Sequence, residues 1–414
     1  MEAKETTTTP KPLHAIVFPI PLQGHVIPAV HLAIKLASKG FTITFVNTQV
    51  IHHHITKSLP STSQNDIDNN VVDIFAGARE VGMDIRYRTV SDGFPLSFDR
   101  LLNHERYLLE DNREDIVAYI PGIKAIEPND MPCYIGELDV STNMHRVLNN
   151  AFESVKRADI ILCNTVHELE FEPISAIQEK QPMFAIGPLF PSGFTNSLVP
   201  TSIKPELDCT EWLNSKLPKS VLYISFGSFV PCGKEEIDEI AHGLVLSKVN
   251  FIWVLRPDAT SYEEPYVLPN GFENEVKGRG LIVTWTNQIQ VISHFAIGGF
   301  LTHCGWNSVL ESVWHGVPML CFPLKTDQLT NRKLLVDDWR IGVNLCDKKP
   351  LDKFEVAEKI NNLMCGKSSD ELRVKITKVK EIIKNSLAQD GSSEKNLCQF
   401  IRDVKTKISG RPRM

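Results

Sequence analysis

The chain has 414 residues, of which 42% are hydrophobic and 23% are charged, as in soluble globular proteins with more than one domain. Its formal net charge of −6 argues against a nucleic-acid-binding protein, which usually has a basic face. The polar start "MEAKETTTTPKP" is not a signal peptide, no apolar run could span a bilayer, and the nine cysteines show no paired spacing. We therefore expect a cytoplasmic protein with reduced thiols and no transmembrane segment.

The first half of the chain begins as strand, helix and strand, which predicts a parallel sheet. "LHAIVFPIP" is typical of a strand buried on both faces, and "LQGHVIPAVHLAIKLASKG" is typical of a helix that ends at glycine. "FTITFVNTQ" is the next strand, and "VVDIFAGAREVGMDIRYRTV" contains one or two short ones. Between Ser91 and Ile135 only helical pieces are found, and "SVKRADIILCNTVHELE" and "MFAIGPL" then restore the strand pattern.

A second alternating series follows the Pro/Ser/Thr-rich linker "FPSGFTNSLVPTSIKPELD". Its predicted strands are "SVLYISFGS", "FIWVLRP", "GLIVTW", "GGFLTH" and "VPMLCFP". The sequence thus predicts two doubly wound α/β domains that face each other across a cleft. The expected limits are an N-terminal domain over 1–189, a linker over 190–208, a C-terminal domain over 209–385, and a final helix and tail over 386–414.

The segment "GFLTHCGWNSVLESVWHGVP" joins a buried strand to an amphipathic helix through a turn crowded with polar and aromatic residues. In a parallel sheet this joint lies at the carboxyl end of the strand, where ligands bind and where the helix presents unpaired N–H groups. Phosphate suits such a site, with His303 as a donor, Asn307 or Ser308 as a cap or contact, and Gly305 allowing a close approach. The alternative is a capped helix in which His303 and Trp306 fill the core.

Further polar or aromatic groups follow the neighbouring predicted strands. Trp285 could stack on a nucleobase, with Gln288 close by, and Glu311 could accept hydrogen bonds from a ribose, although core filling and a solvated helix charge are the simpler explanations. Asp327 and Gln328 suit the hydroxyls of a sugar, although an N-cap would also explain Asp327. Ser228 reaches the same edge. Cys304 is expected to be a small buried residue rather than a nucleophile, and His52–His54 a solvated loop rather than a metal site.

The stretch from Trp285 to Gln328 resembles the signature of the plant UDP-dependent glycosyltransferases of family 1, with "HCGWNS", the glutamate three residues on and the closing "DQ" at the family's spacing. "GHVIPAVHLA", "CTEWLN", "SVLYISFGS", "CNTVHELE", "AIGPL" and "GSSEKNL" are similar to the family too, whereas "WTNQ" departs from it by lacking the usual proline. The resemblance implies a GT-B fold, in which the C-terminal domain holds the UDP-sugar and the N-terminal domain holds the acceptor.

The resemblance also implies a role for each matching residue. Trp285 would stack on uracil, with Thr286 and Gln288 beside it, and Glu311 would hold the ribose. The residues toward the diphosphate would be Ser228, His303, Asn307 and Ser308, and those toward the sugar would be Trp306, Asp327 and Gln328. The closing glutamine favours glucose. No metal and no cofactor besides the UDP-sugar are implied, and we expect a monomer.

His25, in "LQGHVIP", follows the first predicted strand at the ligand edge of its sheet. An unperturbed imidazole can take a proton from a hydroxyl at neutral pH, and the family match favours His25 as the base of an inverting transfer over a structural role. The family's orienting aspartate has no match, since no apolar strand that ends in Asp lies between Ser91 and Ala125, and Asp111 and Asp115 lie in the hydrophilic "LLEDNREDIVAYI". About two strand–helix units of roughly 30 residues each are missing there, so we interpret the domain as internally shortened after about residue 101.

The sequence is compatible with three functions. The first is a UDP-glycosyltransferase that transfers glucose to a hydroxyl group of a small apolar plant metabolite. The second is a protein that binds the nucleotide sugar but is catalytically impaired, because it lacks the acid that orients the histidine base. The third is a nicotinamide-dependent oxidoreductase, against which the absence of "GxGxxG" after the first strand counts.

Overall fold

The computed structural model describes residues 13–59, 72–96, 116–123, 125–132, 143–190, 199–257, 268–347 and 350–409. The chain divides into two compact units. Unit 1 comprises 1–98, 189–205 and 401–414, and unit 2 comprises 99–188 and 206–400. The predicted limits at 189, 208 and 385 stay a prediction, and Asp111 and Asp115 lie outside the described residues.

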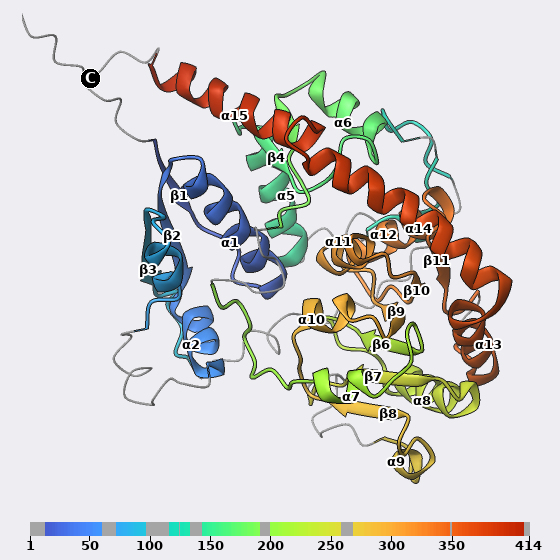
Figure 1. Ribbon diagram of the computed structural model, residues 1–414. Coiled ribbons are helices and arrows are strands. Elements are labelled where there is room, and N and C mark those ends of the chain that lie inside the picture. The colour runs from blue at the N-terminus through green and yellow to red at the C-terminus, as the bar shows by residue number, and fades with distance from the viewer. Residues whose placement is uncertain are drawn as a thin grey trace, which may run out of the picture. The chain divides into compact units, whose positions relative to one another are not determined.

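Unit 1 contains a parallel sheet in the order β1-β2-β3. Its elements are β1 (His14–Val17), α1 (Gln23–Ser38), β2 (Thr42–Thr48), α2 (Gln49–Ser58), α4 (Ala76–Glu80) and β3 (Ile85–Val90) (Figure 1). The predicted strand–helix–strand start is confirmed, and "VVDIFAGAREVGMDIRYRTV" provides one strand preceded by a short helix. The helix α1 ends where Gly40, with a φ of +86°, turns the chain into β2.

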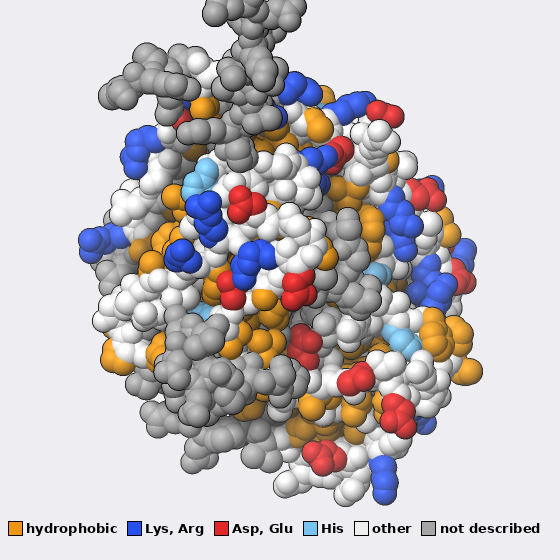
Figure 2. All heavy atoms as spheres, turned by 60° about the vertical axis from the view of Figure 1, so that its left-hand side comes forward, with side chains coloured by type: hydrophobic (Ala, Val, Ile, Leu, Met, Phe, Trp, Pro, Cys, Tyr) orange, Lys and Arg blue, Asp and Glu red, His pale blue; other side chains and the backbone are white. Residues whose placement is uncertain are grey.

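β1 differs from its prediction as a strand buried on both faces. Within the described residues it pairs with β2 on one side and forms an edge of the sheet. Ile16 is 72% exposed, and Phe18 and Ile20, which follow the strand, are 62% and 58% exposed, so no described element covers these side chains. Figure 2, in which the side of the molecule that carries β1–β3 comes forward, shows hydrophobic side chains at the surface among the charged ones. The prediction was wrong because an apolar run indicates burial only if a neighbouring element covers it.

The prediction of a solvated loop at His52–His54 was also wrong, because these residues lie in α2. The helix forms because Val50, Ile51 and Ile55 recur at helical spacing and are buried. His52 is buried with them, and its Nδ1 lies 3.0 Å from the Tyr87 hydroxyl oxygen. The described residues contain no cluster of three or more histidine, cysteine or acidic side chains that could hold a metal ion.

Unit 2 contains a six-stranded parallel sheet in the order β11-β10-β9-β6-β7-β8. Its strands are β6 (Val221–Ser225), β7 (Asn250–Val254), β8 (Gly280–Val283), β9 (Ile297–Thr302), β10 (Met319–Cys321) and β11 (Gly342–Asn344). The sequence predicted the first five, and each is an apolar run that is covered on both faces. β11 was missed because a three-residue strand that contains glycine leaves almost no pattern.

Helices cover both faces of this sheet. Alternate residues of β6 serve two cores, with Val221 and Tyr223 in one and Leu222 and Ile224 in the other. The helices that contribute to the first core are α7 (Thr210–Asn214), α10 (Gln288–Ser293), α11 (Trp306–His315) and α14 (Gly366–Leu387). Those that contribute to the second are α8 (Lys234–Ser247), α9 (Phe272–Glu275), α13 (Lys353–Met364) and, through Leu372, the start of α14.

The remaining described elements of unit 2 are joined to this domain by side-chain contacts. They are η1 (Pro128–Asp130), α5 (Asn143–Val155), β4 (Ile161–Cys163), α6 (Phe171–Gln178), β5 (Met183–Ala185), α12 (Gln328–Lys333) and the π-helical turn η3 (Leu334–Asp338). Arg332 of α12 forms an ion pair with Asp130. The last helix, α15 (Ser392–Ser409), holds the end of β5, because Asn396 Nδ2 donates to the Ala185 carbonyl at 2.8 Å. No described helix is long and apolar enough to cross a membrane.

Candidate donor-binding site

The joint between β9 and α11 is a tight turn of three residues. Cys304 has a left-handed φ of +64°, and the turn is held because its N–H donates to Thr302 Oγ1 and its carbonyl accepts from Asn331 Nδ2. Gly305 is the N-cap of α11, and the helix begins at Trp306. Since Gly305 has no side chain that could cap the helix, the first turn of α11 presents its amides at the carboxyl edge of the sheet.

Two predictions for this turn can be compared with the structure. Asn307 and Ser308 lie inside the first turn of α11, so neither is its N-cap, and contact with an anion is the role that stays a prediction. Cys304 is a fully buried free thiol, and burial raises its pKa well above the usual value. The prediction of a small buried residue is confirmed, and the raised pKa disfavours the thiolate that a nucleophile needs.

His303 is wedged between two glycines. A methyl group added at Gly227 would lie 2.5 Å from His303 Nε2, and one at Gly305 would lie 2.4 Å from the same atom. His303 Nδ1 is buried without a hydrogen bond of normal geometry to any described residue, although the backbone of Ser225 favours its charged form. Burial nevertheless lowers the pKa of His303 to about 4, so the ring is neutral at pH 7. It can donate one hydrogen bond, but it brings no charge.

Three predicted site residues form one hydrogen-bonded cluster. Gln288 Nε2, at the start of α10, donates to Ser308 Oγ at 2.9 Å and to Glu311 Oε2 at 2.7 Å, both on α11. These two donations orient the amide, and the hydroxyl of Tyr223 on β6 lies 3.4 Å from Gln288 Oε1. Glu311 is buried, so it is not the solvated helix charge considered as an alternative. Burial raises its pKa to about 7, against the opposing hydrogen bond from Gln288.

This burial predicts a pH effect on stability. The carboxyl of Glu311 titrates near 7 in the fold and near 4.5 when the chain is unfolded, so its contribution is complete below pH 4.5 and is lost as the pH rises through 7. We expect Glu311→Gln to raise the free energy of unfolding at pH 8, relative to wild type, by up to about 3 kcal/mol. At pH 4 the two proteins should be nearly equal. Urea denaturation at both pH values tests this, with the exposed Glu273→Gln as the control.

Trp285 and Thr286 lie at the end of β8, and both are more than nine-tenths buried. Both residues are hydrogen-bonded to Leu207, in the segment before α7. The Leu207 N–H donates to the Trp285 carbonyl, and the Thr286 hydroxyl donates to the Leu207 carbonyl. Trp285 also belongs to the hydrophobic core that contains Val291 and Cys304. Stacking of a base on the part of the indole that stays accessible remains a prediction.

The residues predicted to face the sugar have different surroundings. Gln328 is buried, and its Oε1 accepts from two successive backbone N–H groups, which leaves the Nε2 end of the amide for a ligand. Asp327 is exposed, and its carboxylate accepts from Thr326 and Asn331 without capping α12. The indole N–H of Trp306 donates to the Asn164 carbonyl at 2.7 Å. Because that side chain is used by the fold, the backbone amide of Trp306 is the group that could meet a ligand.

Sequence reasoning missed Arg256, which follows β7. Arg256 is 4% exposed, and its guanidinium donates to the carbonyls of Ser228 and Val230, in the loop that follows β6. A signal was present, because an arginine at the end of the apolar run "FIWVLR" is an expensive residue to bury. The predicted residue Ser228 is thus held in place by a group that no motif indicated.

His25 is in the first turn of α1, in unit 1, and its side chain is exposed. Two acids of the same unit have other partners, since Asp73 forms an ion pair with Arg79 and Asp84 accepts from Thr42 Oγ1. Every other predicted site residue is in unit 2. The role of His25 as a base, and the acid that would orient it, therefore stay predictions.

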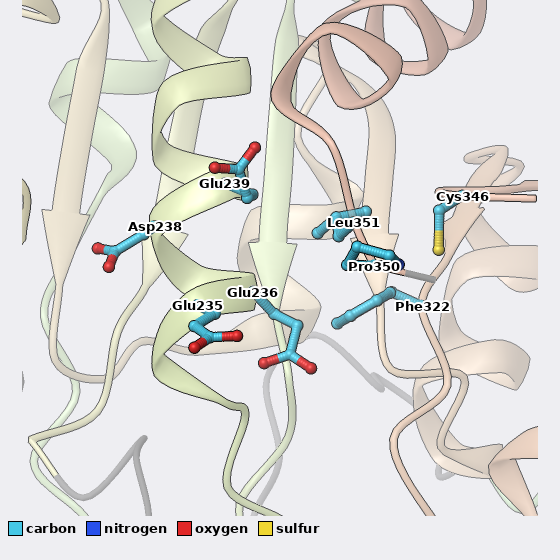
Figure 3. A pocket seen from close by; sticks show the side chains of 8 residues that line it. All are labelled: Glu235, Glu236, Asp238, Glu239, Phe322, Cys346, Pro350 and Leu351. Carbon is cyan, nitrogen blue, oxygen red and sulfur yellow. The ribbon is translucent and has the colours of Figure 1, made fainter. Parts of the chain in front are cut away.

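A cavity of about 610 Å³ lies elsewhere on unit 2, and none of its lining residues is a predicted site residue. Glu235 and Glu236 of α8 line one side, and Phe322, Pro350 and Leu351 lie opposite (Figure 3). Asp238 and Glu239 also line the cavity, and four carboxylates together would repel a diphosphate. The cavity is therefore a poor candidate for the donor site, which the hydrogen-bonded cluster at the start of α11 indicates instead.

The chain is similar to known proteins along most of its length. Residues 189–380 match the family described as UDP-glucoronosyl and UDP-glucosyl transferase. UDP-glycosyltransferase 86A1 of Arabidopsis thaliana is 47% identical, with 95% of each chain covered. 7-Deoxyloganetin glucosyltransferase of Catharanthus roseus is 31% identical, with 96% of this chain and 97% of that protein covered.

Solved structures show the same architecture. A UDP-glucosyltransferase from Polygonum tinctorium capable of glucosylating indoxyl matches with a TM-score of 0.72 and 28% identity, over 95% of this chain and 99% of that one. The predicted GT-B fold is confirmed. The alignment with the Arabidopsis protein runs over 476 positions, more than the 414 residues of this chain, so it leaves gaps opposite part of the relative. Since 95% of this chain, or about 393 residues, takes part, the gaps in this chain come to about 83 positions, which is more than two strand–helix units of roughly 30 residues each.

Proposed function

Because this chain belongs to the UDP-glucoronosyl and UDP-glucosyl transferase family, we propose that it transfers glucose from UDP-glucose to a hydroxyl group of a small, largely apolar acceptor. The observation that carries the proposal is the cluster of Gln288, Ser308 and Glu311 at the uncapped start of α11. Relatives named as glucosyltransferases support glucose as the sugar. The nicotinamide-dependent alternative is wrong, since the family is that of sugar transferases.

In the proposed complex, each part of UDP-glucose meets a group of suitable chemistry. The ionised carboxylate of Glu311 would accept hydrogen bonds from the ribose hydroxyls, which would favour its charged form. The amides at the start of α11 and the neutral ring of His303 would donate to the diphosphate. Gln328 Nε2 and the Asp327 carboxylate would bind glucose hydroxyls. The proposed mechanism needs no metal ion, because N–H donors and a positive helix end stabilise the leaving diphosphate.

The transfer step follows from this arrangement and from His25 as the base. His25 would take the proton of the acceptor hydroxyl while the acceptor oxygen forms a bond to C1 of glucose. The bond between C1 and the β-phosphate oxygen would break, and its electron pair would leave with UDP. Since the attack comes from the face opposite the leaving group, the configuration at C1 is inverted. The developing negative charge would be stabilised by groups that are already in position.

A second candidate function is donor binding with impaired transfer. The gaps in the alignment with the Arabidopsis relative favour it, as does the edge position of β1 in the described part of unit 1. In this form the residues of unit 2 would bind UDP-glucose as in the first proposal. Without the acid that orients His25, turnover would be lower by orders of magnitude.

Calorimetric titration with UDP and a radiolabelled UDP-glucose assay on a panel of phenols separate these candidates. Both proposals require UDP binding, and a chain that binds no UDP would contradict both. Binding with turnover, lost in His25→Ala, supports the glycosyltransferase. Binding without turnover on any phenol selects the impaired form. Resequencing the transcript across Leu101 to Asp115 would show whether the shortening is present in the natural message.

A further inference from the structure

Arg256 is the most deeply buried cation near the start of α11 that the described residues show. It follows β7, the strand next to β6, and its side chain contacts the loop that follows β6. Nη1 donates to the Ser228 carbonyl at 2.9 Å, and Nη2 donates to the Val230 carbonyl at 3.1 Å. The two bonds use the planar fork of the guanidinium, which a lysine cannot reproduce. Arg256 therefore fixes the carbonyls of two residues that are separated by one other residue.

The loop that Arg256 holds is also the loop against which His303 packs. Gly227, with a φ of +76°, places its Cα directly against the His303 ring. The charge of Arg256 acts on the same ring, where it disfavours a second positive charge. Arg256, Ser228 and His303 thus meet at the carboxyl edge of β6 and β9, which are neighbours in the sheet.

A UDP-sugar site at this edge needs positive potential. The diphosphate is negative, and Glu311 and Asp327 bring negative charge of their own. His303 is neutral, and the start of α11 supplies only about half an elementary charge. Arg256 adds a full charge, and its burial means that solvent screens that charge poorly.

We infer that Arg256 is a positioning residue for the diphosphate of the nucleotide sugar, acting through the loop at Ser228 and through its buried charge. The inference rests on the proposed function. As the bond from C1 to the β-phosphate oxygen breaks, charge moves onto the diphosphate, so the positive potential becomes more favourable during the reaction. Removing the charge should weaken binding of UDP and should also lower kcat.

The test compares two ligands that differ only in the diphosphate. Arg256→Met is expected to raise the Kd of UDP by about 10- to 50-fold, and to leave the Kd of uridine unchanged. Arg256→Lys keeps the charge but cannot donate to both carbonyls with the same geometry, so it should raise the Kd of UDP by a smaller factor. The matched control is Arg279→Met, because Arg279 also donates to backbone carbonyls, at Leu244, Val245 and Val249. It precedes β8 and thus lies at the opposite edge of the sheet.

Each outcome decides a different point. Wild type that binds no UDP contradicts the proposed function. Wild type that binds UDP, with Arg256→Met binding it equally well, overturns the inference alone. Equal weakening of UDP and uridine would assign Arg256 a merely structural role and would also overturn it. If circular dichroism shows that Arg256→Met does not fold, Arg256→Lys provides the test. A larger loss of affinity for UDP than for uridine in that variant supports the inference, and an equal loss for both ligands, or none, overturns it.

Discussion

Replacement of His25 by alanine is expected to lower kcat for glycosyl transfer by roughly 10²- to 10⁴-fold, the range that a general base contributes. The affinity for UDP should not change, because His25 belongs to unit 1 and the donor residues belong to unit 2. His25 is exposed in the first turn of α1, so removal of its side chain leaves no cavity in the core. Initial rates with UDP-glucose and an accepted phenol measure the first quantity, and calorimetry measures the second.

The control for this prediction is His14→Ala. His14 is another exposed histidine of unit 1, and it lies 2.8 Å from the Thr44 hydroxyl on β2 rather than at the ligand edge. The His14 variant should keep the wild-type kcat. Equal activity in the His25 variant and in wild type would show that another group removes the acceptor proton.

Replacement of Gly227 by alanine is expected to lower kcat/KM by about 100-fold or more, the cost of a displaced hydrogen-bond donor to a developing charge. The new methyl group would lie 2.5 Å from His303 Nε2, and the ring is buried, so either the ring or the loop must shift. The same loop contains Ser228, whose carbonyl is held by Arg256. The diphosphate site would therefore lose its alignment on two sides at once. Steady-state kinetics with UDP-glucose measure the effect.

Gly278→Ala separates this displacement from backbone strain. Gly278 also has a left-handed φ, +81°, but a methyl group there meets nothing within 4 Å. Both substitutions therefore carry the strain of a left-handed alanine, which costs about 1 kcal/mol of stability. Only Gly227→Ala should change kcat/KM. A parallel loss in both variants would attribute the effect to stability rather than to His303.

The sequence was most informative where burial on both faces left an unmistakable apolar run. β6 and β9 are examples, because their whole lengths are covered by helices from both sides. The same reasoning failed for β1, since an apolar pattern does not say whether a neighbour is present. It failed for His52 as well, because burial against Tyr87 depends on a contact made 35 residues away.

In the candidate site, motif spacing led to the residues but not to their contacts. The link from Gln288 to Glu311 crosses 23 residues and depends on how α10 and α11 pack. Packing also decides that Trp306 gives its indole N–H to Asn164, 142 residues earlier. The end of the apolar run "FIWVLR" marks Arg256 in the sequence, but the carbonyls that it reaches could be found only in three dimensions. Residue type and spacing suggest chemistry, whereas partners are set by the tertiary fold.

The open edge of β1 has a consequence for the fate of the chain in a cell. Among the described residues β1 pairs with β2 alone, and Ile16, Phe18 and Ile20 are exposed beside its free edge, which makes that edge a template onto which other extended chains can add. In newly synthesised chains, aggregation through this edge would therefore compete with binding by chaperones. The amount of folded, non-aggregated protein would then depend more on expression level and temperature than on the affinity of the donor site for the sugar nucleotide.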